Sequence, residues 1–131
     1  MNIVRLSEHV WKCSTWVIIP INVWLVRSAE GLTLVDAGIP TMGKPLLRFI
    51  QPLGLPLKRI LLTHGHSDHV GALEHLRRHH AVPVLAHREE IPYAEGIQPY
   101  PRRKKAAASV ARAWSTWNQF FTFLVAEGTV A

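Results

Sequence analysis

Residues 60–73 read ILLTHGHSDHVGAL, and they place three histidines and one aspartate within six positions, directly after an apolar run. Those four residues are His64, His66, Asp68 and His69. The whole chain has eight histidines and two aspartates, so background composition does not account for the cluster. Imidazole and carboxylate groups are ligands that suit zinc, and they also bind iron or manganese. The stretch therefore predicts a metal site at the end of a strand.

The spacing within this stretch predicts two pairs of ligands. A chain that leaves a strand in extended geometry sends alternate side chains the same way, which aims His64 and His66 at one ion. If the chain then turns into a helix near Asp68, that carboxylate and the adjacent His69 face the other side of the turn, where a second ion can sit. The alternative is a metal-free helix cap in which the four side chains hydrogen-bond to one another, since such closely set polar groups need partners.

Apolar patterning around the stretch predicts an alternation of strands and helices. Strands are predicted at 3–6, 10–13, 21–27, 32–36, 58–63 and 82–86. Helices are predicted at 42–53, 70–80 and 88–94, the first with Thr41 as its N-cap. The continuous apolar run at 58–63 is typical of a strand that is covered on both faces of its sheet.

The other histidines and the N-terminal tryptophans are expected to be structural. The remaining histidines of the predicted helix at 70–80 are His75, His79 and His80. Because two arginines lie on the same helix, this pattern indicates a solvated basic face rather than further ligands. The tryptophans that precede residue 30 are Trp11, Trp16 and Trp24. We expect them to pack against the sheet rather than to contact a substrate.

The run from His64 to His69 resembles the H-x-H-x-D-H signature of the metallo-β-lactamase fold hydrolases. LTLVDAGIP at 32–40 and VGALEHLRR at 70–78 resemble the surroundings of that signature, and the resemblance covers about residues 20–96. It implies an α/β fold, the αββα sandwich of two similar halves. This chain resembles the first half, so residues 1–98 are expected to form a mixed sheet with flanking helices. Beyond the resemblance, residues 99–131 are expected to form a basic linker and, from the apolar spacing at 106–125, an amphipathic helix.

The same resemblance implies a zinc-dependent hydrolase with one or two ions, or with iron or manganese in their place. His64, His66, Asp68 and His69 match the family's ligands, and Asp68 is also expected to steer the attacking water. In such a site a metal-activated hydroxide attacks an ester, a thioester, a lactone or a lactam of a small-molecule substrate. Asp36, at the end of the predicted strand 32–36, is expected to hydrogen-bond the ring N–H of a ligating imidazole and so fix its orientation. The alternative for Asp36 is a carboxylate that stabilises its own turn.

The family's complete pattern adds a further ligand to each pair, and an aspartate that bridges both ions, from the second half. Residues 100–131 contain neither histidine nor aspartate. A catalytic zinc requires three protein ligands, whereas this sequence offers two for each ion. Either the chain is a truncated or naturally shortened member of the family, or a homodimer or another partner completes the site. The alternative function is that of a truncated, catalytically inactive metal-binding remnant.

Charge and cysteine content limit the classes of partner and compartment. Of the net charge of +6, four charges come from residues after 98, where five basic residues, four of them in RRKK at 102–105, oppose one glutamate. A basic run of this kind is usually a solvated linker, so we expect no nucleic-acid partner, and a nucleic-acid-processing protein remains the second alternative. The single Cys13, the absence of a signal-peptide pattern and the lack of an apolar run of about 18 residues predict a cytoplasmic protein without a transmembrane segment.

Overall fold

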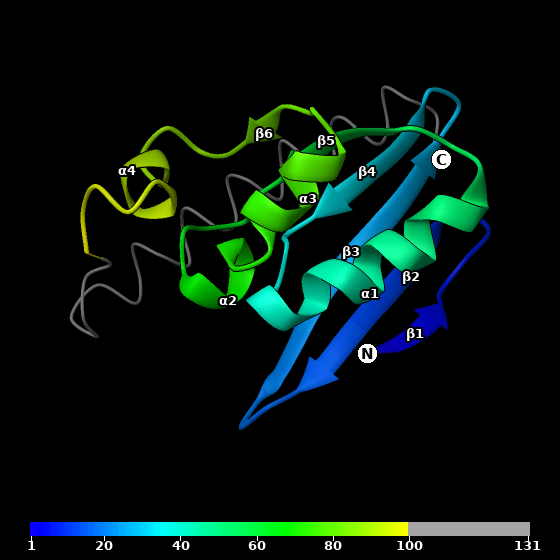
Figure 1. Cartoon of the computed structure of the whole chain (residues 1–131), viewed down its shortest axis with the longest axis horizontal. Coiled ribbons are helices and arrows are strands. Elements are labelled where there is room, and N and C mark those ends of the chain that lie inside the picture. Colours follow the sequence, from blue (N-terminus) through cyan, green and yellow to red (C-terminus); the bar gives the residue numbers. More distant parts are fainter. Residues whose placement is uncertain (100–131) are drawn as a thin grey trace.

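The structure, a computed structural model, describes residues 1–99. In this part of the chain six strands form one sheet in which neighbouring strands follow the chain order (Figure 1). Their bounds are β1 Asn2–Arg5, β2 Val10–Trp16, β3 Pro20–Ser28, β4 Gly31–Val35, β5 Leu57–Leu61 and β6 Val84–Leu85. Strands β1 to β4 pair antiparallel, whereas β5 pairs parallel with both β4 and β6. The predicted mixed sheet is confirmed.

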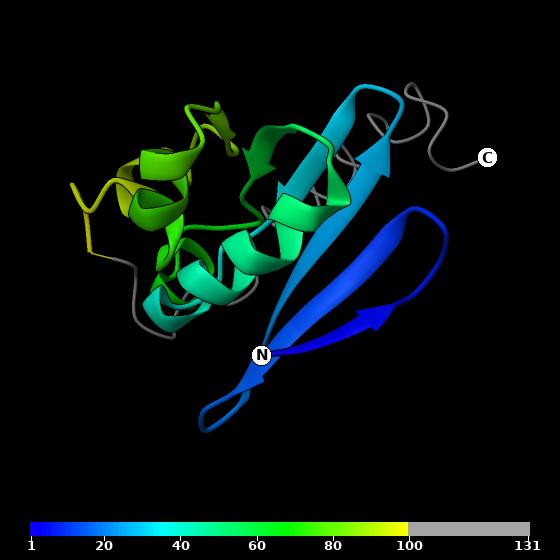
Figure 2. The same cartoon turned by 45° about the vertical axis from the view of Figure 1, so that its right-hand side comes forward.

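Helices α1 (Gly43–Ile50) and α3 (Leu73–His79) lie against one face of this sheet (Figures 1 and 2). Parallel strands need a crossover connection, and α1 supplies the one between β4 and β5. The apolar residues buried between helices and sheet include Leu34, Leu46, Ile50, Ile60 and Leu76. Burial of these side chains is the main force that holds the helices on the sheet.

The neighbouring parallel strands β4 and β5 differ in burial. Every residue of β4 is buried, whereas β5 has the exposed Lys58 and the half-buried Arg59 and Leu61. The strand predicted at 58–63 is observed as β5. Among residues 1–99 the helices cover one face of the sheet, while Leu61 packs on the other face in a small cluster with Val26 and Val35.

The predicted helix at 42–53 is three consecutive pieces, namely the 3-10 helix η1 Pro40–Met42, then α1, then the 3-10 helix η2 Gln51–Leu53. Thr41 lies inside η1, and neither η1 nor α1 has a side-chain cap, so the predicted Thr41 N-cap is wrong. A proline stands in the first turn of each 3-10 helix, where its missing N–H costs no hydrogen bond. Gly54 ends the segment in a left-handed conformation with φ 66°, as its position predicts.

The predicted helix at 70–80 is likewise two helices, α2 Ser67–Val70 and α3, and α2 begins inside the histidine cluster. Gly71 separates them at a close approach of two loops. Its N–H donates a hydrogen bond to the Gly38 carbonyl at 2.8 Å, and a Cβ at Gly71 would lie 2.8 Å from that oxygen. The loop after β4 and the loop after β5 are thereby held together.

The hairpin of β2 and β3 extends past the end of β4, because β4 pairs with β3 only from Trp24 onward. Trp11 is buried and Trp24 packs in the second cluster, as expected for sheet-packing residues. Trp16 is 72% exposed at the tip of the hairpin, so its predicted packing against the sheet is wrong.

The last helix of the described residues is α4 (Ile91–Ala94). Among residues 1–99, none of the helices combines the length and the apolar character that a membrane span requires. The predicted amphipathic helix at 106–125 lies outside the described residues.

Candidate metal centre

The histidine cluster lies at the edge of the sheet where β4 and β5 end. Because these neighbouring strands are parallel, the residues that follow them, Asp36 and Thr63, emerge at the same edge. The Asp36 N–H donates to the Leu61 carbonyl at 2.7 Å, which continues the strand pairing by one residue. Ligand sites of α/β proteins commonly lie outside the carboxyl ends of such strands.

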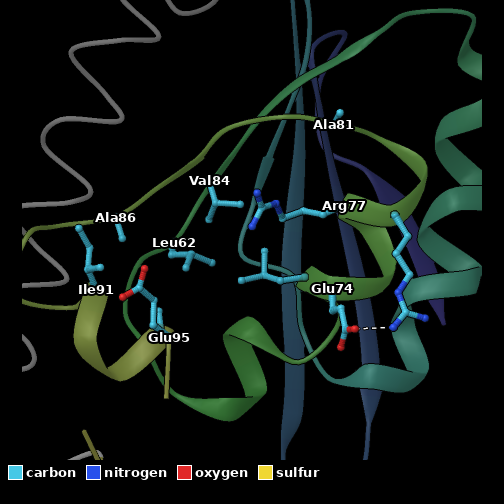
Figure 3. Close-up of a pocket in the computed structure, with 11 residues that line it drawn as sticks. Leu62, Glu74, Arg77, Ala81, Val84, Ala86, Ile91 and Glu95 are labelled. Atoms are coloured by element: carbon cyan, nitrogen blue, oxygen red, sulfur yellow. Dashed lines mark hydrogen bonds and ion pairs between the residues drawn. The ribbon is translucent and has the colours of Figure 1, made fainter. Parts of the chain in front are cut away.

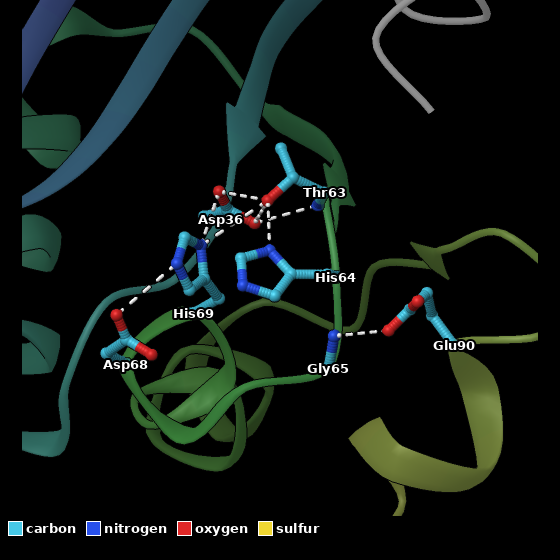
Figure 4. A network of polar contacts seen from close by, with 7 residues as sticks. All are labelled: Asp36, Thr63, His64, Gly65, Asp68, His69 and Glu90. Carbon is cyan, nitrogen blue, oxygen red and sulfur yellow. Dashed lines mark hydrogen bonds and ion pairs between the residues drawn. The ribbon is translucent and has the colours of Figure 1, made fainter. Parts of the chain in front are cut away.

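Asp36 is the buried centre of a hydrogen-bond network at this edge (Figure 4). Its carboxylate accepts the Thr63 N–H at 2.8 Å and the Thr63 hydroxyl at 2.8 Å, and it lies 2.8 Å from His69 Nδ1. The Asp36 backbone has φ 61°, a left-handed conformation that aspartate tolerates better than most residues. A fully buried carboxylate needs such donors, and here they fix the carboxylate against the His69 ring.

The four predicted ligand residues lie where the loop after β5 enters α2, and three of them, the histidines, have their rings close together. The His64 ring lies 3.9 Å from the His69 ring and 4.7 Å from the His66 ring, measured between centroids. Asp68 Oδ2 lies 3.4 Å from His69 Nε2, so the two nitrogens of His69 face two different carboxylates (Figure 4). The Thr63 hydroxyl lies 3.0 Å from His64 Nδ1 and links that ring to Asp36.

The donor chemistry of this loop fits a divalent ion, although residues 1–99 do not close a cage around one. A histidine whose Nδ1 is held by a carboxylate presents its Nε2, and this is the usual arrangement of a metal-bound imidazole. Within the described residues, no three His, Cys, Asp or Glu side chains are grouped so that they could hold a metal ion. The loop therefore offers pairs of donors, and further ligands are needed for a complete site.

Burial and neighbouring charges give the three rings different proton affinities. Burial lowers the pKa of His64 to about 4, and the neighbouring His69 and His66 act in the same direction. Burial also lowers the pKa of His66. Burial acts to lower the pKa of His69 too, but the hydrogen bond to Asp36 and the charges of Asp36 and Asp68 outweigh it and raise that pKa. His64 is thus neutral at pH 7, as a metal ligand must be.

In the metal-free chain, we expect His64 to stay neutral down to about pH 4, whereas His69 stays protonated above pH 6.5. The contribution of His64 to stability is present above pH 6.5 and lost as the pH falls toward 4, because the unfolded state then binds the proton more tightly. The contribution of His69 is present below pH 6.5 and lost as the pH rises through its folded pKa. An NMR titration of the ring protons measures both. A His69 ring that titrates below pH 6.5 would contradict the assigned contact with Asp36.

Sequence reasoning missed two residues of this network, Thr63 and Glu90. Glu90 is fully buried, and its Oε2 accepts the Gly65 N–H at 3.0 Å (Figure 4). Thr63 directly precedes His64, and this position next to the cluster is a signal that could have identified it. The stretch HREEIP holds two adjacent glutamates, and no local pattern shows that Glu90 is buried while Glu89 is exposed.

A cavity of about 740 Å³ opens between α3, β6 and α4 (Figure 3). Leu62, Val84 and Ile91 contribute apolar surface, and Arg77 points toward Val84 from α3. None of the four predicted ligands lines it. Ala94 of α4 lines the cavity and also approaches Gly65, so α4 stands between the cavity and the histidine loop.

Curated relatives match between 42% and 80% of this chain and at most 49% of their own length. A probable metallo-hydrolase of Bacillus subtilis, YybB, is 36% identical over 109 residues, which cover 80% of this chain and 49% of that protein. A hydroxyacylglutathione hydrolase of Photobacterium profundum is 36% identical over 59 residues, which cover 44% of this chain and 22% of that protein. The chain spans about half, or less, of the length of the curated relatives that it matches.

Solved structures likewise match most of this chain and about half, or less, of their own length. A metallo-beta-lactamase from Pontibacter korlensis superposes with a TM-score of 0.64 at 27% identity, over 80% of this chain and 52% of that one. BJP-1, a subclass B3 metallo-beta-lactamase of Bradyrhizobium japonicum, superposes with a TM-score of 0.63 over 81% of this chain and 40% of that one. The fold predicted from the histidine motif, one half of an αββα sandwich, is confirmed. The family model of the metallo-beta-lactamase superfamily matches residues 17–129, and the chain belongs to that superfamily.

Proposed function

We propose that this chain supplies the metal-binding loop of a metal-dependent hydrolase that acts on a small-molecule ester, thioester, lactone or lactam. The observation that carries the proposal is the contact of 2.8 Å between the buried Asp36 carboxylate and His69 Nδ1, at the edge where two parallel strands end. That contact fixes the tautomer of a ring that lies against His64 and Asp68. Membership of the superfamily supports the same reaction class.

In the proposed site His64 and His66 form one pair of ligands, and Asp68 and His69 form the other. Zinc suits these nitrogen and oxygen donors, and when bound it lowers the pKa of water toward about 7 and polarises a carbonyl group. Asp36 orients the His69 ring through its contact with Nδ1, and the Thr63 hydroxyl contacts both Asp36 and His64. Asp68, at the half-exposed rim of the loop, is placed to orient a water molecule toward the substrate.

The remaining ligands are proposed to come from outside this copy of residues 1–99, for example from a second copy of this chain or from another polypeptide. This follows from the pairs of donors that the loop offers and from the fraction of its relatives that the chain spans. The relatives named hydroxyacylglutathione hydrolases favour an acyl-glutathione thioester among the four substrate classes. The alternative, a metal-binding chain without catalysis, is favoured by the same open arrangement of donors.

The test is hydrolysis by the purified 131-residue chain after loading with zinc, measured on one substrate of each of the four classes. If a second copy of the chain supplies the remaining ligands, we expect turnover of at least one class, its fall to the background rate on chelation, and its return with added zinc. Zinc binding without turnover would show that the chain by itself is not catalytic, either because it is the non-catalytic alternative or because another polypeptide supplies the remaining ligands. Turnover that survives chelation would reject the metal-dependent mechanism.

A further inference from the structure

Glu90 is a fully buried carboxylate on the far side of the histidine loop from Asp36 (Figure 4). It is distant in sequence from the loop, yet its Oε2 accepts the N–H of Gly65 at 3.0 Å. Gly65 is the residue between His64 and His66, the two rings proposed to bind one ion. Hence a buried acceptor holds the backbone midway between two ligands.

The position of Glu90 is itself fixed by backbone hydrogen bonds. Its N–H donates to the His87 carbonyl at 2.8 Å, and its carbonyl accepts the Ala94 N–H at 3.0 Å. Helix α4, which begins at the next residue, therefore carries Glu90 as a rigid unit. The carboxylate consequently lies on a defined support rather than on a free loop.

Helix α4 also contacts Gly65 directly. A Cβ at Gly65 would lie 2.8 Å from the Ala94 nitrogen and 2.8 Å from the Tyr93 Cβ, which is closer than carbon atoms approach in folded proteins. Glycine is thus the residue that this contact permits. Glycine also has the greatest backbone freedom, so without support the segment His64-Gly65-His66 would sample many orientations of its two rings.

The contacts of Glu90 bear on the geometry of the proposed ligand pair. Placing a carboxylate in a buried position is unfavourable unless it gains strong hydrogen bonds, and the charge strengthens its bond to the Gly65 N–H. We propose that Glu90 is a positioning residue that removes the backbone freedom of Gly65 and so holds His64 and His66 in the mutual orientation that a metal ion requires. This inference rests on the proposed metal-binding function.

The experiment uses the 131-residue chain and three variants, with Co²⁺ as the probe. Glu90→Ala removes the acceptor, Glu90→Gln retains a neutral one, and Glu95→Ala alters an exposed glutamate just after the same short helix as the control. In Glu90→Ala we expect Co²⁺ affinity, measured from the absorption bands of the bound ion, to fall by about 10–100-fold. Glu90→Gln should recover most of that loss, and Glu95→Ala should bind as the wild-type chain does.

Amide hydrogen exchange of Gly65 in the metal-free chains gives a second readout that needs no metal. The Gly65 N–H should exchange slowly in the wild-type chain and in Glu90→Gln, and quickly in Glu90→Ala. Fast exchange in the wild-type chain, or wild-type Co²⁺ affinity in a folded Glu90→Ala, overturns the inference. If Glu90→Ala does not fold, the wild-type exchange rate and Glu90→Gln decide it. A wild-type chain that binds no Co²⁺ rejects the proposed function. Slow exchange of the Gly65 N–H in that chain would still show that Glu90 holds the loop.

Discussion

Replacing Asp36 by alanine is expected to lower the free energy of unfolding by about 3–5 kcal/mol, because it leaves buried donors without an acceptor. Those donors are the N–H and hydroxyl of Thr63 and, on its protonated nitrogen, the ring of His69. The variant also places alanine at φ 61°, where aspartate is tolerated better. Urea unfolding of the metal-free chain measures the change without a contribution from bound metal.

The matched control is Asp36→Asn, which keeps the left-handed backbone preference and an oxygen that can accept the Thr63 N–H. We expect it to cost about 1–2 kcal/mol, since it loses the charge but not every hydrogen bond. It should also return the pKa of His69 toward lower values, because the negative partner is gone. An Asp36→Ala chain that unfolds within about 0.5 kcal/mol of the wild type would show that the network contributes little.

Replacing both His64 and His66 by alanine is expected to reduce zinc affinity by more than about 100-fold, beyond the 10–100-fold typical of residues that only orient a ligand. The reason is that one whole pair of nitrogen donors is removed. The metal-free variant should remain folded, because His66 is exposed and His64 is half-buried, so neither ring is part of the apolar core. Competition of the protein with a chromogenic zinc chelator measures the affinity.

His79→Ala is the control for this double variant. His79 is an exposed histidine on α3, outside the proposed ligand loop, and its loss should leave zinc affinity unchanged. If the double variant binds zinc as tightly as His79→Ala does, the proposed ligand pair is wrong and the metal is held elsewhere.

The elements that sequence predicts well are those with strong local signals. The strands predicted at 21–27 and 32–36 are observed as β3 and β4, joined by a turn at residues 29–30, because a short turn between two apolar runs leaves few alternatives. The end of the apolar run at 58–63 places the histidine cluster at the end of a strand, and β5 ends two residues before Thr63. The expected proximity of Asp36 to a ligand histidine is seen as the 2.8 Å contact with His69, while its role toward a metal stays a prediction.

The features that sequence did not reveal depend on contacts between distant segments. The burial of Glu90 follows from the packing of α4 on Gly65, which lies 25 residues earlier in the chain. The break between α2 and α3 follows from the approach of Gly71 to Gly38, not from the apolar spacing of the helices. His75, expected on a solvated face, instead packs its ring against Gly43 of α1.

Zinc X-ray absorption spectroscopy on the zinc-loaded 131-residue chain tests the proposed metal centre most directly. We predict that zinc is retained and bound by nitrogen and oxygen alone, with zinc–nitrogen distances of about 2.0–2.1 Å and an imidazole scattering pattern. The single Cys13 is buried in the core of the sheet, so no sulfur ligand is expected. A chain that retains no zinc, or a spectrum with a zinc–sulfur shell near about 2.3 Å, would contradict this prediction.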